Sequence, residues 1–157
     1  KIPAAFGGNG TTTYGSFKWY ECQEVFAAYG KKAPTYAEFM ALAYGVTEET
    51  DRGSDPGTTQ LDAARTSKWG VIQATGNLRV WGRDVIADGT GSGAYRDIAE
   101  GRGEIYTYND DLRAGNFGGL WAGGDRAGSR SSNWTGSVSD SRDIISGRGV
   151  CDHLILD

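Results

Sequence analysis

The sequence contains little cysteine and little proline, and it is not the sequence of a disulfide-rich or redox domain. Its two cysteines, Cys22 and Cys151, form no Cys-x-x-Cys motif of a metal or redox site. A chain of 157 residues can bury about 70% of its unfolded surface, so it needs no disulfide framework. Cys22 falls on an apolar helix face and Cys151 in a strand-like segment. We therefore expect two buried free thiols, with a disulfide between them as the alternative.

Histidine is nearly absent as well, and this argues against catalysis. A serine hydrolase needs a histidine that is oriented by an acid and faces a serine nucleophile. The single histidine, His153, lies in a predicted strand with no nucleophile motif nearby. We therefore assign no catalytic residue.

Basic clusters and long apolar runs are also missing. The net charge is −4 and no basic stripe is present, whereas phosphate neutralisation requires clustered Lys and Arg. No apolar run is long enough to cross a membrane. We expect neither nucleic-acid binding nor membrane insertion. Because the chain begins with Lys1 rather than Met, we expect a piece of a longer protein or a processed product.

Glycine is the abundant residue, at 25 positions against an average usage near 7%. The glycines follow no period, which excludes collagen and indicates long turns and irregular loops. Two amphipathic helices precede most of these loops. The first covers about 16–29, with Ser16 as its N-cap and Gly30 after its end, and the second begins at the capping box 35–38 and ends at Gly45. Their apolar faces are expected to comprise Trp19, Cys22, Val25, Phe26 and Tyr29, then Phe39, Met40, Ala43 and Tyr44.

The later part of the chain has the alternation and the turn signals of β structure. Residues 69–86 predict a β hairpin around a turn at 75–77, and shorter strands are expected at 11–14 and 104–108. Residues 148–156 are expected to contain a buried C-terminal strand. The predicted fold class is α+β, as one domain over residues 1–157 with two helices, antiparallel hairpins and long Gly/Ser-rich loops.

The segment 118–147 has the composition of a binding surface. It is rich in Gly, Ser, Asn and Thr, and it lacks the helix or strand period of a core-building segment. Rigid aromatic rings and arginines on such a small, polar background are typical of ligand-binding loops. Its aromatic and basic residues are Trp121, Trp134, Arg126, Arg130 and Arg142.

Several blocks resemble one protein family. KKAPTYAEFMALAYG (31–45), LRVWGRDV (78–85) and FGGLWAGGDRAGSR (117–130) are similar, in the correct order, to blocks of the formylglycine-generating-enzyme type of C-type lectin fold. The ending RGVCDHLIL, with Gly-Ser-Arg at 128–130 and a Trp four residues beyond, resembles the variable proteins of diversity-generating retroelements. Within that family, the ending is most similar to phage tropism determinants. The resemblance implies a C-type lectin fold used as a static scaffold, whose ligand-facing residues are exchanged by mutagenic reverse transcription.

The same resemblance separates constant positions from variable ones. It implies that Trp121, Trp134 and the segment 148–156 belong to the constant framework. The positions implied to vary, and therefore to bind ligand, lie within 120–145. They are Leu120, Ala122, Gly123, Gly124, Arg126, Asn133, Thr135, Gly136, Asp140, Arg142, Ile144 and Ile145.

By resemblance, the chain is a receptor-binding domain at the tip of a phage tail fibre. It would be a homotrimer that recognises a protein or a glycan on the host cell surface. A variable protein displayed on a bacterial surface and a carbohydrate-binding lectin are the alternatives, since Trp and Arg also suit sugars. The formylglycine-generating-type oxidase shares the fold, but its chemistry needs a pair of neighbouring cysteines that Cys22 and Cys151 do not reproduce. The expectation is a binding protein that is not an enzyme and needs no cofactor.

Some residues have two possible roles in the sequence. Arg126 and Arg142 are candidates for contacts with acidic groups of the target, or are solvated loop residues. Arg130 and Arg148 are expected to hold loop carbonyls or a carboxylate such as Asp152. Ile144 and Ile145 predict an exposed apolar patch, with burial as the alternative.

Loop carboxylates raise the question of a structural calcium ion. No EF-hand spacing is present, and loop carboxylates are usually solvated, so no metal site is assigned. The candidate ligands are Asp84, Asp88, Asp110 and Asp111.

Overall fold

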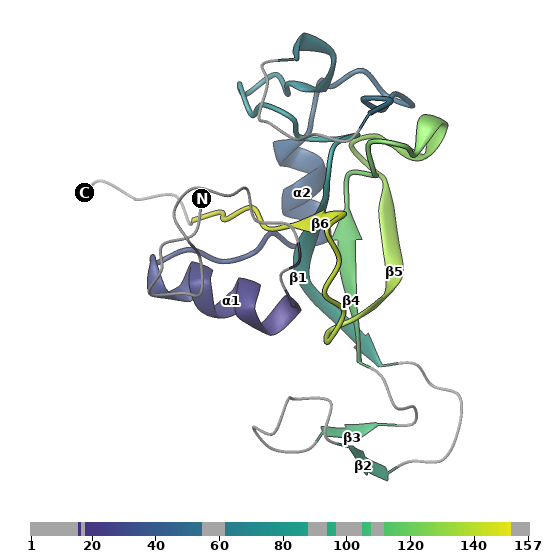
Figure 1. Cartoon of the computed structure of the whole chain (residues 1–157). Coiled ribbons are helices and arrows are strands. Elements are labelled where there is room, and N and C mark those ends of the chain that lie inside the picture. Colours follow the sequence, from purple (N-terminus) through teal and green to yellow (C-terminus); the bar gives the residue numbers. More distant parts are fainter. Residues whose placement is uncertain are drawn as a thin grey trace, which may run out of the picture.

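The computed structural model describes residues 16, 18–54, 62–87, 94–96, 105–107 and 112–151. These residues form a four-stranded sheet with two helices, and a small separate hairpin (Figure 1). The α+β class predicted from the sequence is confirmed. The elements are α1 (Trp19–Ala28), α2 (Tyr36–Leu42), η2 (Ala63–Arg65), β1 (Arg79–Ala87), β2 (Ala94–Arg96), β3 (Ile105–Thr107), β4 (Leu112–Phe117), η3 (Gly124–Arg126), β5 (Ser132–Ser137) and β6 (Ile145–Ser146).

The sheet has the strand order β5-β4-β1-β6, so β5 is an edge strand. β4 pairs antiparallel with both β1 and β5, whereas β6 runs parallel to β1. α1 packs against β1, and α2 packs against β1 and β4. Both helices lie on the side of β1 and β6, which leaves the outer edge of β5 uncovered among the described residues (Figure 1).

Helix α1 confirms the first predicted helix but not its cap. The N-cap position is Lys18, whose backbone N–H donates to the Glu21 carboxylate at 3.1 Å. Ser16 lies before the helix with a positive φ of 89°, so it does not cap the first turn. Gly30 has the predicted left-handed φ of 63°, and it follows the last turn because its N–H donates to the Ala27 carbonyl.

Helix α2 begins at the predicted capping box. The Thr35 hydroxyl accepts from the Glu38 N–H at 3.1 Å, and the Glu38 carboxylate accepts from the Thr35 N–H at 2.7 Å. These two bonds satisfy backbone donors that no helical carbonyl reaches. On the buried face, Phe39 and Ala43 are fully buried, but Tyr44 is exposed, as is Tyr29 at the end of α1. The two predicted apolar faces are therefore confirmed except at their last tyrosines and at Met40, which is partly exposed and packs in neither core cluster.

The predicted hairpin over 69–86 is wrong. Only 79–87 is a strand, and its antiparallel partner is β4, about thirty residues later. Residues 69–78 form turns instead, with positive φ at Gly70, Gln73 and Gly76. Alternating apolar residues suggested a strand there, but consecutive turns override the pattern. The expected strand at 104–108 is present as β3, whereas the one expected at 11–14 lies outside the described residues.

The C-terminal segment also differs from its prediction where the structure describes it. Residues 147–151 form no extended strand, and Val150 makes a single bridge to Lys32. The short strand β6 holds this part of the chain against β1. Residues 152–157, which include His153, are outside the described part of the chain.

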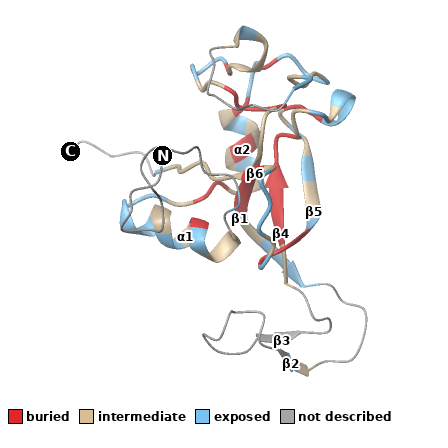
Figure 2. Cartoon of the chain, in the orientation of Figure 1, coloured by how far each residue is buried: buried red, intermediate tan, exposed pale blue. Residues whose placement is uncertain are grey.

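Two buried clusters form the core, one under each helix (Figure 2). Cys22 belongs to the α1 cluster, and burial raises the pKa of its thiol to about 12. Cys151 is exposed, which corrects the expectation of two buried thiols, and both cysteines are free. The buried members of the clusters are Cys22, Trp81, Ala114, Val138 and Ile145 under α1, and Phe39, Ala43, Val46, Ala74, Val80 and Phe117 under α2.

Candidate functional site

The positions implied to vary follow β5 and the segments at its two ends. The loop that carries η3 lies beyond one end of β5, and the segment that leads to β6 leaves from the other end (Figure 1). Five of these side chains or glycines are exposed and five are partly exposed. The exposed positions are Ala122, Gly124, Arg126, Thr135 and Arg142, and the partly exposed ones are Leu120, Gly123, Asn133, Asp140 and Ile144.

The last two implied positions, Gly136 and Ile145, are buried. Ile145 is 2% exposed and packs in the α1 cluster with Trp81 and Cys22. A Cβ atom on Gly136 would lie 2.8 Å from the Asn116 side chain and 3.1 Å from the Trp81 ring. The exposed isoleucine pair predicted from the sequence is therefore wrong for Ile145, and Ile144 packs against the same cluster. In this fold, neither Gly136 nor Ile145 is exposed on the surface.

The loop 118–131 is held by tight glycines and by backbone hydrogen bonds. Gly118 and Gly119 have positive φ, and a Cβ on Gly119 would lie 2.6 Å from the Ala127 Cα. The Gly123 N–H donates to the Leu120 carbonyl at 2.9 Å, and the Arg126 N–H donates to the Gly123 carbonyl at 3.2 Å. The loop thus has a defined conformation of its own.

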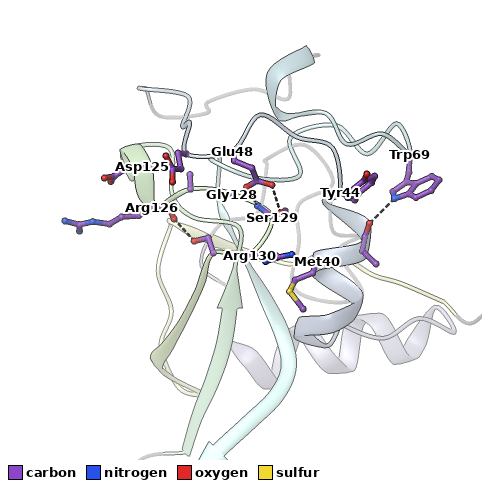
Figure 3. Close-up of a pocket in the computed structure, with 13 residues that line it drawn as sticks. Met40, Tyr44, Glu48, Trp69, Asp125, Arg126, Gly128, Ser129 and Arg130 are labelled. Atoms are coloured by element: carbon purple, nitrogen blue, oxygen red, sulfur yellow. Dashed lines mark hydrogen bonds between the residues drawn. The ribbon is translucent and has the colours of Figure 1, made fainter.

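A second segment, residues 48–53, braces this loop from outside. The Asp51 carboxylate accepts from the Gly124 N–H at 2.5 Å, and the Gly53 N–H donates to the Trp121 carbonyl at 2.8 Å. The Glu48 carboxylate accepts two hydrogen bonds from Ser129 (Figure 3). None of these bracing residues was predicted to have a role. Polar residues of a loop give no sequence signal for a partner more than seventy positions away.

Trp134 fixes β5 on the α2 cluster. Its ring lies 5.8 Å from the Phe117 ring and 6.1 Å from the Tyr36 ring, both edge-to-face. Trp134 is partly buried, in agreement with the framework role implied for it. Next to it, Asn133 turns back on the strand and accepts from the Thr135 N–H and hydroxyl at 2.9 and 2.8 Å. The strand therefore presents Asn133 and Thr135 as one hydrogen-bonded pair.

Arg142 and Asp140 form a second polar pair beyond the other end of β5. The Arg142 guanidinium lies 3.1 Å from the Asp140 carboxylate, and its side chain is 57% exposed. An exposed pair of this kind contributes about 0–1 kcal/mol to stability, so little is lost when either partner turns to a ligand. Arg142 also lies close enough to Arg79 to help lower the pKa of Arg79, after the larger effect of burial.

The predicted structural role of Arg148 agrees with its contacts. Its guanidinium donates to the carbonyls of Ile72 and Gln73 at 3.0 and 3.4 Å, and burial lowers its pKa. It therefore fixes the turns before β1, as expected for an arginine that holds loop carbonyls. Arg130 differs, because only its backbone carbonyl makes a hydrogen bond, which it accepts from the Tyr36 hydroxyl at 2.6 Å. Among the described residues its guanidinium makes no hydrogen bond or ion pair.

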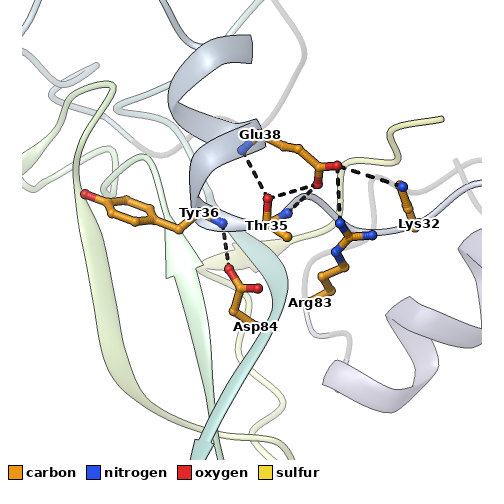
Figure 4. A network of polar contacts seen from close by, with 6 residues as sticks. All are labelled: Lys32, Thr35, Tyr36, Glu38, Arg83 and Asp84. Atoms are coloured by element: carbon orange, nitrogen blue, oxygen red, sulfur yellow. Dashed lines mark hydrogen bonds and ion pairs between the residues drawn. The ribbon is translucent and has the colours of Figure 1, made fainter. Parts of the chain in front are cut away.

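Asp84 has a structural partner in this fold. Its carboxylate accepts from the Tyr36 N–H at 2.7 Å, at the start of α2 (Figure 4). Nearby, Glu38 accepts from Thr35 and lies 3.3 Å from Arg83 and 3.9 Å from Lys32. The backbone hydrogen bond from Thr35, followed by the smaller effects of its hydroxyl and the two cations, lowers the pKa of Glu38.

The described residues give no group of three or more His, Cys, Asp or Glu side chains that could hold a metal ion. Asp88, Asp110 and Asp111, the other three calcium candidates, lie outside the described residues. Nor does any described helix have the length and apolar character needed to cross a membrane.

A groove of about 900 Å³ lies between the end of α2 and the loop 125–131 (Figure 3). Sequence reasoning missed it, because its walls come from three separate segments and its two exposed rings fell in a predicted helix face and a predicted strand. Its lining residues are Met40, Ala41, Tyr44, Glu48, Glu49, Trp69, Asp125, Arg126, Ala127, Gly128, Ser129, Arg130 and Ser131.

Comparison with known proteins gives one sequence relative with high similarity. Over its whole length the chain is 40% identical to the tail fiber receptor-binding protein of Bordetella phage BPP-1. The match covers 42% of that protein, so the chain spans about two-fifths of its relative's length. No protein-family model matches the chain.

Solved structures give the same result. The M1 variant of the Major Tropism Determinant aligns with a TM-score of 0.81 and 40% identity, over 98% of this chain and 42% of that one. The U1 variant aligns with a TM-score of 0.80 and 41% identity, over 97% and 42% of the two chains. The C-type lectin-like fold implied by the sequence resemblance is therefore confirmed. The chain is therefore homologous to part of a tail fiber receptor-binding protein and of Major Tropism Determinant variants.

Proposed function

We propose that this chain, a homologue of part of a phage tail-fibre receptor-binding protein, is itself a receptor-binding domain of a phage tail fibre. It recognises a host cell-surface receptor through the side of the molecule formed by β5 and its flanking loops. The observation that carries the proposal is the placement of ten of the twelve implied ligand positions on exposed or partly exposed sites in β5 and in the segments at its two ends. The homology over the full chain supports the same function.

The proposal includes diversification of this surface by a retroelement. It is supported by the separation of the two kinds of position in the fold. The bracing residues Glu48, Asp51 and Gly53 lie outside the implied variable set and hold the loop 118–131, while Arg126 in this loop, Thr135 in β5 and Arg142 beyond it are exposed. A scaffold of this kind allows the exposed residues to change without loss of the fold.

The proposal also includes a homotrimer displayed at the fibre tip. Linked sites gain 10²–10⁴ in avidity when their geometry allows simultaneous contact, so a weak single site is sufficient on a fibre. Display on a bacterial surface is the alternative location, and it is distinguished by whether the protein copurifies with virions.

The test is binding of the full-length protein to a panel of intact bacterial strains. One variant carries Arg126→Ala, Asn133→Ala, Thr135→Ala and Arg142→Ala. A matched control carries Glu24→Ala and Lys31→Ala, which change exposed charges in and after α1, away from β5. We expect selective binding that the fourfold variant loses and the control retains, with both variants folded. Equal binding by the fourfold variant and the wild type would refute the proposed surface.

A further inference from the structure

The groove beside α2 is lined almost entirely by positions outside the implied variable set, unlike the proposed receptor-binding surface. Of its 13 lining residues, Arg126 is the only one among the positions implied to vary. The Arg126 side chain also extends away from the aromatic residues and Arg130 (Figure 3). Diversification of the implied variable positions therefore leaves Tyr44, Trp69 and Arg130 of this groove unchanged.

Two aromatic rings form one wall of the groove, and they are unusually exposed. Trp69 is 67% exposed and Tyr44 is 57% exposed, with their ring centroids 6.4 Å apart. The Trp69 indole N–H donates to the Ala41 carbonyl at 2.9 Å, and the Lys68 ammonium lies 5.8 Å from the centre of the Tyr44 ring. The rings are held in place with the indole donor already used. What Trp69 offers to a ligand is the apolar face of its ring.

The other walls of the groove carry charged groups without partners. The Arg130 guanidinium, beside Met40 in Figure 3, makes no hydrogen bond or ion pair among the described residues. The same holds for the exposed carboxylate of Glu49. By contrast, the Glu48 carboxylate accepts two hydrogen bonds from Ser129. These bonds fix the loop segment that carries the next residue, Arg130. The groove thus combines an apolar aromatic wall with charged groups of both signs that have no partner among the described residues.

We propose that this groove is a saccharide-binding site. A pyranose ring has an apolar face of C–H groups and a rim of hydroxyls, and the groove offers a complementary surface to each. The C–H face packs on Trp69 and Tyr44, while hydroxyl or carboxylate groups of the sugar reach Arg130 and Glu49. A volume of about 900 Å³ lies in the range of small-molecule sites and admits more than one sugar unit.

The inference rests on the proposed function in one respect. A saccharide site that does not vary would let the fibre attach weakly to a glycan shared by many hosts, while the diversified side selects the receptor. Saccharide binding in the groove itself depends only on Trp69, Tyr44, Arg130 and Glu49.

The test uses the intact full-length protein labelled with 5-fluorotryptophan. Maltotriose, chitotriose and 3′-sialyllactose are added separately, each at about 10 mM, well above the millimolar Kd of a weak single site. We expect at least one of them to shift the fluorine resonance of Trp69, which Trp69→Phe identifies. The resonance of Trp81, which is fully buried, serves as the internal reference.

Variants then locate the site. Tyr44→Ala and Arg130→Ala should each weaken saccharide binding at least tenfold, whereas Tyr29→Ala, which removes another exposed tyrosine, should leave the Kd unchanged. Trp69→Phe keeps an aromatic ring, so it should bind the saccharide more tightly than Trp69→Ala does. Calorimetry measures the Kd of both variants. No shift with any of the three sugars, or binding that Trp69→Ala does not affect, would overturn the proposal.

Two further results separate this inference from the proposed function. The triple variant Asn133→Ala, Thr135→Ala, Arg142→Ala should lose strain selectivity but retain the sugar-induced shift of Trp69. If it keeps strain selectivity, the proposed receptor surface fails while the groove result stands. Trp69→Ala also defines the part of cell attachment that depends on the groove. If this part survives periodate treatment of the cells but not protease treatment, the partner is a protein and the saccharide assignment is wrong.

Discussion

The Glu48 carboxylate and Ser129 are joined by two hydrogen bonds, from the serine N–H at 2.8 Å and from its hydroxyl at 2.5 Å. This link crosses 81 residues of sequence and ties the segment after α2 to the loop before β5. A Cβ atom on the neighbouring Gly128 would lie 2.4 Å from the same carboxylate, so a side chain at that position would displace Glu48 from Ser129.

We expect Glu48→Ala to loosen the loop 120–131 with a small loss of stability. Both groups are at least partly exposed, so the free energy of unfolding should fall by only about 1 kcal/mol. Binding to strains should weaken by more than that value predicts, because the loop loses its conformation. Urea unfolding and cell binding are the two measurements, with Glu24→Ala, an exposed carboxylate of α1, as the matched control. A variant that binds cells as well as wild type would show that the brace is unnecessary.

Two positions of the implied variable set should respond in opposite ways. Ile145→Ala removes a core side chain beside Trp81, so unfolding should become easier by about 2–5 kcal/mol. Arg142→Ala removes an exposed side chain and should change stability by no more than about 0.5 kcal/mol. Chemical denaturation of both variants measures this contrast. Similar losses at the two positions would contradict the burial described for them.

Gly82 is expected to be intolerant of any side chain. A Cβ atom there would lie 2.3 Å from the Phe117 ring, so Gly82→Ala should lower the free energy of unfolding by about 1–3 kcal/mol. In a Phe117→Leu background the same substitution should cost less, because the ring is gone. A double-mutant cycle by urea denaturation tests this coupling. Additive effects would mean that the backbone, not the ring, restricts Gly82.

Glu38 should contribute a pH-dependent part of the stability. Because its pKa lies below the ordinary value of 4.5 in the folded state, its contribution is present above pH 4.5 and is lost as the pH falls through the folded pKa. The difference in unfolding free energy between wild type and Glu38→Gln should therefore shrink below that pH. Urea denaturation of the two proteins at several pH values measures this difference. A constant difference down to pH 3 or so would exclude this linkage.

The two thiols should react at very different rates. Burial raises the pKa of Cys22 to about 12, so it has almost no thiolate at pH 8, whereas Cys151 is exposed. Maleimide should label Cys151 in the folded protein and Cys22 only after denaturation. Mass spectrometry of peptides after a short pulse distinguishes the two sites. Rapid labelling of Cys22 in the native state would require opening of the α1 cluster.

The sequence was most informative where the structure is local. The Thr35–Glu38 capping box and Gly30 were predictable, because each depends on residues within a few positions. It was misleading at 69–78, where an apolar alternation occurs within consecutive turns, and at Ser16, where backbone with positive φ replaces a cap. Chain position alone also could not show that Cys151 is exposed.

The candidate site was predictable as a segment but not as a surface. Composition and resemblance located the binding region in 120–145, yet neither could separate Arg142 from the buried Ile145, because burial depends on packing with α1 and β1. The groove at Trp69 and Arg130 required the fold, since these residues lie about sixty positions apart in sequence. The groove is indicated by two large aromatic residues, Tyr44 and Trp69, that are exposed instead of buried in the core, and this exposure is known only from the fold.

The hydrogen bonds that shape the loop at 120–126 have one more consequence. The N–H groups of residues 123 and 126 donate to backbone carbonyls, so nineteen of the twenty amino acids can supply these bonds and only proline cannot. A library randomised at Arg126 and selected for folding alone should accept most residue types and lose proline. Main-chain atoms therefore hold this part of the loop, so its conformation does not depend on the side chain of Arg126.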